Sequence, residues 1–136
     1  MLVDAGPLIA ICNENDKFHV VCNAVITSFG ITLLTTEGCI VEAMYFAGKH
    51  QGFRGQQAIW NMIENHIVEI VETDQSDRLN SFELMTKYQD VPMDYADAGL
   101  VALAMKLNDY TIFTTDAHFH AYPGNRQEKF QVIPEL

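Results

Sequence analysis

Solubility alone does not explain the positions of four acidic residues: Asp4, Glu42, Asp97 and Asp116. Asp4 follows the apolar run "MLV", and Asp116 follows the β-branched run "YTIFTT". Glu42 is the only charge within "CIVEAMYF", and glutamate is seldom buried unless it is paired or bound to a cation. No matching set of lysines or arginines accompanies these segments, so the shared partner that we expect is a divalent cation. Hard carboxylate oxygens suit Mg²⁺ or Mn²⁺, which bind through a few such ligands and retain water for chemistry.

Each acid also has a structural explanation when it is taken singly. Asp4 can cap the helix that begins near Pro7, and Asp116 can form an Asx-turn. Glu37 lies well round the helix from Glu42, and we interpret it as an ordinary acid of the first helical turn. The four acids together are therefore a more specific signal than any one of them.

The segment "VPMDYADAGLVALAMKL" carries two acids, Asp94 and Asp97, three positions apart. This spacing puts them near the same face of a helix, and it also matches an N-terminal cap followed by a first-turn acid. The run after Asp97 is apolar nearly all round, which predicts a buried helix. We interpret Asp94 as the cap or an acid outside the direct ligand set, and Asp97 as the candidate metal ligand.

The elements that must position these acids alternate between strands and helices. Strands are predicted over 1–3, 31–36, 66–72, 110–115 and 129–134, with a turn-rich stretch over 123–128. Helices are predicted over 6–12, 19–29, 37–48, 55–65, 76–90 and after Asp94. This order predicts an α/β fold with a mainly parallel sheet, in which ligands bind beyond the carboxyl ends of the strands.

Composition indicates one folded domain over residues 1–136. The chain is 49% hydrophobic and 19% charged, which is typical of a globular protein with its own core. No apolar stretch reaches the length of a membrane span and the first residues lack a basic region, so we expect no membrane association and a cytoplasmic location. Three cysteines without a CxxC spacing predict reduced thiols rather than disulfides or a zinc site.

The formal net charge of −10 disfavours binding to a polyanion without a basic patch or a metal. "GKHQGFRGQQ" brings Lys49, His50 and Arg54 together as candidate RNA contacts, although a solvated turn between helices is the favoured interpretation. His118 and His120 follow Asp116 closely, but we do not favour them as metal ligands.

The order of these segments resembles that of the PIN-domain ribonucleases. The segments are "LVDAGPLIA", "TTEGCIVEAMYF", "PMDYADAGLVALA" and "IFTTDAHF", and the likeness runs end to end, including the closing "F…VIP". Within that superfamily the chain looks most like VapC-type toxins and their free-standing relatives. The resemblance implies a three-layer α/β/α sandwich in which the acidic quartet falls on Asp4, Glu42, Asp97 and Asp116. Thr114 then matches the family's Thr-x-Asp, and Asp94 is an extra acid beside the pattern.

The activity that this resemblance implies is metal-dependent hydrolysis of RNA phosphodiester bonds with Mg²⁺ or Mn²⁺. Asp4 and Asp116 would be direct ligands, Asp97 a ligand directly or through water, and Glu42 a ligand or the holder of the attacking water. The resemblance also implies a small antitoxin that covers the groove, and a homodimer.

Two alternatives stay open: a non-catalytic PIN-like module that binds RNA or protein, and a stand-alone housekeeping nuclease. Receiver and haloacid-type phosphatase folds also gather aspartates at strand ends. Asp116 stands where a receiver needs lysine, and Gly6 stands where the phosphatase carries its second aspartate. The chain has no GxSxG and no GxxxxGK[ST] sequence, which argues against a nucleophilic hydrolase and a P-loop enzyme.

Overall fold

The computed structural model describes residues 1–124 and 129–136. The predicted turn over 123–128 therefore lies mostly outside the described residues. Within the described part, no helix is long and apolar enough to cross a membrane.

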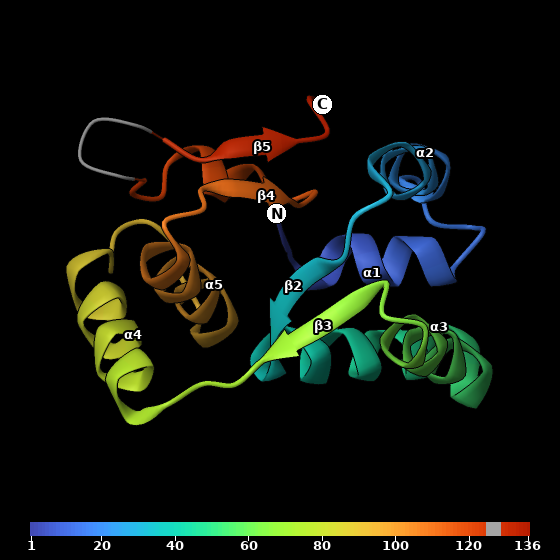
Figure 1. Ribbon diagram of the computed structural model, residues 1–136, viewed down its shortest axis with the longest axis horizontal. Helices are drawn as coiled ribbons and strands as arrows, with labels where there is room; N and C mark the ends of the chain where they lie inside the picture. Colours follow the sequence, from blue (N-terminus) through green and yellow to red (C-terminus); the bar gives the residue numbers. More distant parts are fainter. Residues whose placement is uncertain (125–128) are drawn as a thin grey trace.

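A parallel sheet forms the middle layer of the molecule (Figure 1). Among the described residues it has five strands in the order β3-β2-β1-β4-β5, and every neighbouring pair is parallel. Its central strand β1 is fully buried and apolar, and most residues of the flanking strands β2 and β4 are buried too, as expected for a parallel sheet covered on both faces. The strands are β1 (Leu2–Val3), β2 (Leu33–Thr36), β3 (Val68–Val71), β4 (Thr111–Phe113) and β5 (Gln131–Ile133).

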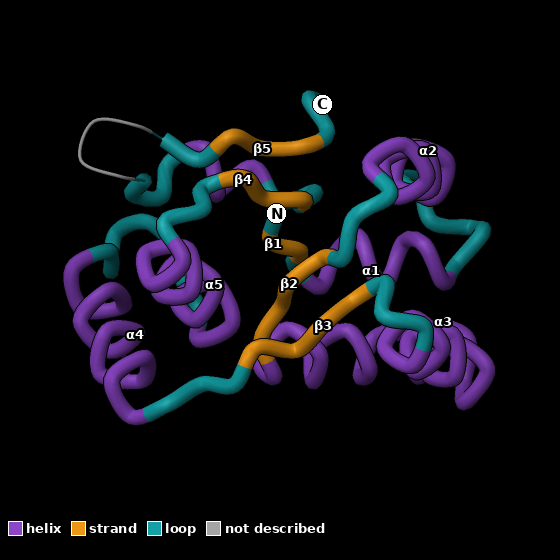
Figure 2. Tube along the Cα trace, viewed as in Figure 1, coloured by secondary structure: helices purple, strands orange, loops and turns teal. Residues whose placement is uncertain are grey.

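Helices cover both faces of this sheet. One layer holds α1 to α3, where α1 packs against both α2 and α3, and the other layer holds α4 packed against α5 (Figures 1 and 2). The three-layer α/β/α sandwich predicted from the sequence is therefore confirmed. The helices are α1 (Ala5–Cys12), α2 (His19–Phe29), α3 (Glu37–Glu64), α4 (Gln75–Lys87) and α5 (Tyr95–Leu107), and a short 3₁₀ helix, η1, spans Ala117–His120.

The chain reverses its direction across the sheet between β1 and β4. From β1 it moves outward to β2 and β3, and it then returns through α4 and α5 to place β4 on the other side of β1. Leu2 pairs with Leu34 of β2 and with Ile112 of β4. Such a switch point leaves a crevice beyond the carboxyl ends of the two strands. The residues that follow β1 and β4 must line it.

The helix α5 is buried through its middle, as predicted from its sequence. Ala98, Leu100 and Val101 are fully buried, and exposed side chains lie at its two ends, such as Tyr95 and Met105. Asp94 is its N-cap. The prediction of a buried helix that starts with a capping aspartate is confirmed.

Residues 37–64 contain the two predicted helices, which follow one another directly and are divided by a kink. The kink lies at Gly52, whose φ of 62° and ψ of −153° suit glycine. The second half of α3 then approaches the first so closely that a Cβ at position 55 would lie 2.7 Å from the carbonyl oxygen of Ala47. The prediction of two helices is therefore confirmed, but the break between them is shorter than the predicted turn, because helical structure continues through Lys49.

We expect Gly55→Ala to destabilise the fold by about 1–3 kcal/mol, since the added methyl must push the backbone of Ala47 away. Gly38→Ala is the matched control, because the nearest atom to its new Cβ is 3.6 Å away and alanine favours the helix. Urea unfolding measures both. Equal stability of Gly55→Ala and wild type would contradict the close contact.

Candidate active site

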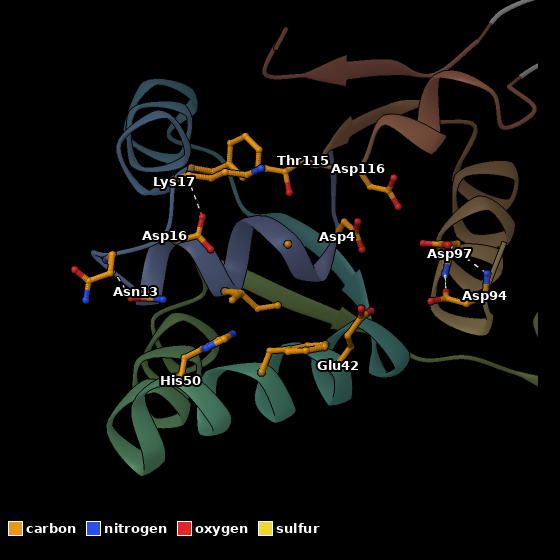
Figure 3. A pocket seen from close by; sticks show the side chains of 15 residues that line it. Asp4, Asn13, Asp16, Lys17, Glu42, His50, Asp94, Asp97, Thr115 and Asp116 are labelled. Atoms are coloured by element: carbon orange, nitrogen blue, oxygen red, sulfur yellow. Dashed lines mark hydrogen bonds between the residues drawn. The ribbon is translucent and has the colours of Figure 1, made fainter. Parts of the chain in front are cut away.

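One groove of about 580 Å³ opens at the switch point between β1 and β4 (Figure 3). Its lining includes acids that come from separate elements: the β1–α1 junction, α3, the start of α5 and the segment after β4. They are Asp4, Glu42, Asp94, Asp97 and Asp116. The structure thus brings all the acids singled out from the sequence to one groove.

Asp4 is the most deeply placed of these acids, with 6% of its surface exposed. Its Oδ1 accepts a hydrogen bond of 2.7 Å from the Ala5 N–H, so it is also the cap of α1. Its Oδ2 accepts a bond of 2.8 Å from the Thr114 hydroxyl. Thr114 Oγ1 in turn accepts from the Asp116 N–H at 3.0 Å. This chain of bonds ties the end of β1 to the end of β4 and orients both acids.

Asp94 and Asp97 form a capping box at the start of α5. Asp94 Oδ1 accepts from the Asp97 N–H at 2.8 Å, and Asp97 Oδ2 accepts from the Asp94 N–H at 3.2 Å. Asp97 is half-buried, whereas Asp94 is exposed. Both residues therefore serve the helix, and both still line the groove.

Tyr122 holds Asp97 from the other side, and sequence reasoning missed it. Its hydroxyl donates to the carbonyl of Pro92 and lies 3.1 Å from Asp97 Oδ2. The ring is buried beside Phe119 of η1. An aromatic residue six positions after Asp116 carries no sequence signal that it will reach α5, so only the tertiary structure shows this contact.

Glu42 projects from α3 towards Asp4 (Figure 3). It is half-buried, whereas Val41 and Tyr45 beside it are 66% and 62% exposed. The premise that apolar neighbours enclose Glu42 was therefore only partly right. Glu42 is half-buried because its side chain lies in the groove. One turn earlier, the Cys39 thiol is buried 3.9 Å from Asp4 Oδ1, and the pKa of this thiol is raised to about 12 by burial and by the Asp4 charge.

Asp116 combines a place in the groove with the Asx-type turn that was its structural alternative. Its Oδ1 accepts from the His118 N–H at 2.9 Å and lies 2.7 Å from His118 Nδ1. His118 is thus a hydrogen-bonding partner of Asp116 itself. His120 is exposed and does not line the groove.

Burial and mutual repulsion raise the proton affinity of three of these acids. The pKa of Asp97 rises to about 7, first because the carboxyl is desolvated and then because Asp94 and Asp4 are near. The pKa values of Asp4 and Glu42 are raised for the same two reasons. Across the described residues, no lysine or arginine forms an ion pair with them. The groove therefore calls for a positive counter-charge, and a proton or a cation can supply it.

A divalent cation fits the chemistry of this donor set, which consists of hard carboxylate oxygens that are partly desolvated. The residues that would hold it are Asp4, Asp97 and Asp116, with Glu42 facing them across the groove. Throughout the part of the chain that is described, however, no three acidic, histidine or cysteine side chains converge tightly enough to cage an ion as they stand. The arrangement suits an ion such as Mg²⁺, which keeps several of its waters.

Two of the three residues named from the sequence as RNA contacts do not line the groove. Arg54 lines a neighbouring polar pocket with His19 and Gln51, and Lys49 lines neither that pocket nor the groove. The third, His50, does line the groove, and so does Lys17, which sequence reasoning missed. A lysine in the connection between two helices has no sequence feature that places it beside an acidic site.

Comparison with known proteins identifies the class. The model of the PIN domain family matches residues 1–125, and the chain therefore belongs to the PIN-domain family. A relative from Mycobacterium tuberculosis, ribonuclease VapC26, is 26% identical over 135 residues, which cover 98% of this chain and 100% of the relative.

Two solved structures share the fold. M. tuberculosis VapC20, described as a toxin that cleaves the sarcin-ricin loop, has a TM-score of 0.79 at 16% identity and covers 85% of this chain and 88% of its own. VapBC2 from Rickettsia felis, bound to a DNA fragment from its promoter, has a TM-score of 0.65 at 14% identity, with 90% and 92% covered.

The raised pKa of Asp97 predicts how stability depends on pH in a chelating buffer. The folded protein holds this proton more tightly than the unfolded chain does. The stabilisation is therefore complete below the ordinary pKa of 3.8 and is lost as the pH rises through about 7. We expect Asp97→Asn to make the downward slope of the free energy of unfolding shallower between pH 3.8 and 7, while Asp4 and Glu42 keep their own contributions.

Asp90→Asn, at an exposed position outside the groove, is the control and should follow wild type. Urea unfolding at a series of pH values gives the three curves. Parallel curves for wild type and Asp97→Asn would show that the proton affinity of Asp97 is ordinary.

Proposed function

We propose that the protein is a metal-dependent ribonuclease that hydrolyses RNA phosphodiester bonds, and that it is the toxin of a toxin–antitoxin pair. The observation that carries the proposal is the meeting of acids from four elements of a PIN fold at one switch-point groove. The name of VapC26 as a ribonuclease and the toxin description of VapC20 support the same activity.

The proposed cofactor is Mg²⁺ or Mn²⁺, held by Asp4, Asp97 and Asp116. When bound, such an ion neutralises charge on the phosphate and lowers the pKa of a water molecule. Thr114 keeps Asp4 pointed at the groove through its hydroxyl. Tyr122 does the same for Asp97 from outside the capping box. Glu42, which lines the groove from α3, would hold the attacking water.

The two alternatives differ from this proposal in separate ways. A non-catalytic PIN-like module has no need of all four acids, and their retention in one groove favours the enzyme. A stand-alone housekeeping nuclease would share the chemistry and lack an antitoxin. The VapBC2 complex supports a protein partner, and a short reading frame directly upstream in the genome would favour the toxin. A homodimer and a cytoplasmic location remain predictions.

Asp4→Asn and Asp116→Asn should each lower Mn²⁺-dependent RNA cleavage by at least ~100-fold, because loss of a ligand exceeds the usual cost of losing a partner of a ligand. Both variants should fold, since asparagine still caps a helix or turn. Asp4→Asn should be as stable as wild type or more so at neutral pH, since it removes a buried charge.

Asp90→Asn serves as the control, with cleavage of a labelled RNA and urea unfolding measured on the same preparations. Undiminished cleavage in both groove variants would refute the proposed site. A wild-type protein that cleaves no RNA with either metal would refute the proposed function.

A further inference from the structure

The groove has a second end, and its chemistry differs from that of the acidic end. Lys17 and His50 lie at this end, away from Asp94 and Asp97 (Figure 3). Phe18 and Phe46 also line the groove. The residues come from the α1–α2 connection and from the middle of α3. We name this set of four side chains, Lys17, Phe18, Phe46 and His50, the aromatic end.

The helix α3 joins the two ends of the groove. Glu42, Phe46 and His50 follow one another at intervals of four residues, which places them in a row along one helix face. Each interval advances roughly 6 Å along the axis, a step comparable to that between successive nucleotides of an extended strand. The rings of Phe46 and His50 are nearly parallel, with an angle of 20° and a centroid distance of 6.3 Å. A partly exposed aromatic surface thus begins one helical turn beyond the acidic cluster.

The α1–α2 connection supplies a cation opposite this row. Lys17 Nζ lies 4.8 Å from the ring centroid of Phe18. The Phe18 N–H donates a bond of 2.8 Å to Asp16 Oδ1, which fixes the connection and engages an acid that also lines the groove. Because the chain has a net charge of −10, a lysine that lines the groove is a candidate for attracting the RNA backbone. The groove thus offers three kinds of group in sequence to a bound RNA strand. The acids would lie at the cleaved phosphate, the aromatic ring at a base, and the cation at a further phosphate.

We propose that the aromatic end is a nucleobase subsite, in which the base next to the cleaved phosphate stacks on Phe46 while Lys17 contacts the neighbouring phosphate. The inference rests on the proposed ribonuclease function and adds to it how the RNA is held. Stacking on an aromatic ring tolerates any base, because every base has a π-face. A positive side chain beside the ring supplies the attraction to the backbone that the rest of the surface opposes.

The test distinguishes the effect of the aromatic ring at position 46 from the effect of an apolar side chain there. Phe46→Leu keeps an apolar side chain and loses the π-face, whereas Phe46→Trp keeps a stacking surface. Phe82→Leu is the matched control, because Phe82 is 71% exposed on α4, outside the groove. The substrates are one RNA with a known cleavage position and a series in which a single abasic nucleotide replaces each position in turn.

One abasic RNA should be cleaved about tenfold more slowly than the intact strand by wild type, Phe46→Trp and Phe82→Leu. In this RNA the abasic nucleotide should lie next to the cleavage position. Phe46→Leu should cleave the intact RNA about tenfold more slowly and should no longer distinguish the two. The kinetic constant compared is kcat/KM, and thermal unfolding verifies that each variant is folded.

Full discrimination by Phe46→Leu would overturn the proposal. Cleavage of intact RNA by Phe46→Leu at the wild-type rate would also overturn it. If wild type cleaves no RNA, the proposed function fails together with the subsite. If wild type cleaves and Phe46 has no effect, only the subsite fails.

Discussion

The burial of Asp4 between the ends of β1 and β4 is the constraint on which the rest of the site depends. A carboxylate with 6% of its surface exposed needs partners, and Ala5 and Thr114 supply two hydrogen bonds. These bonds orient the group without removing its charge, and Asp116 and Asp94 add repulsion. The fold therefore concentrates negative charge at the switch point, where it remains costly until a positive charge arrives.

The surrounding elements hold the acids in place against this repulsion. The capping box ties Asp97 to Asp94, and Tyr122 reaches Asp97 from the segment after η1. The buried apolar body of α5 prevents the pair from moving apart, because displacement of Asp97 would disturb packed core residues such as Leu100. On the opposite side α3 carries Glu42, and the same helix extends to the aromatic end. The helices α3 and α5 thus hold the acids in place, and α3 also sets the position of the aromatic end relative to them.

Local patterns predicted much of this molecule. The helix over 19–29 ends at Gly30 in a left-handed conformation, as its sequence predicts, and Asp94 is the expected cap. The acids were found because each is chemically out of place in an apolar context. These features could be predicted from the sequence because each depends on residues only a few positions apart.

The features that were missed depend on contacts between distant segments. The turn between the two halves of α3 shortens to a kink at Gly52, where the second half folds back on the first at Gly55. Lys17 lines the groove and Tyr122 contacts Asp97 only through the tertiary fold. Lys49 and Arg54 were named for their charge, and the fold directs them elsewhere. Proximity in the chain was a poor guide to which cations lie near the acids.

The central claim is that a divalent cation takes the place of the proton that the groove otherwise retains. Calorimetric titration of wild type with Mn²⁺ at about pH 6.5, in two buffers of different ionisation enthalpy, tests this most directly. With the pKa of Asp97 at about 7, binding should release a measurable fraction of a proton, and the release should decrease in Asp97→Asn. Binding heats that are the same in both buffers, or no binding at all, would contradict the account.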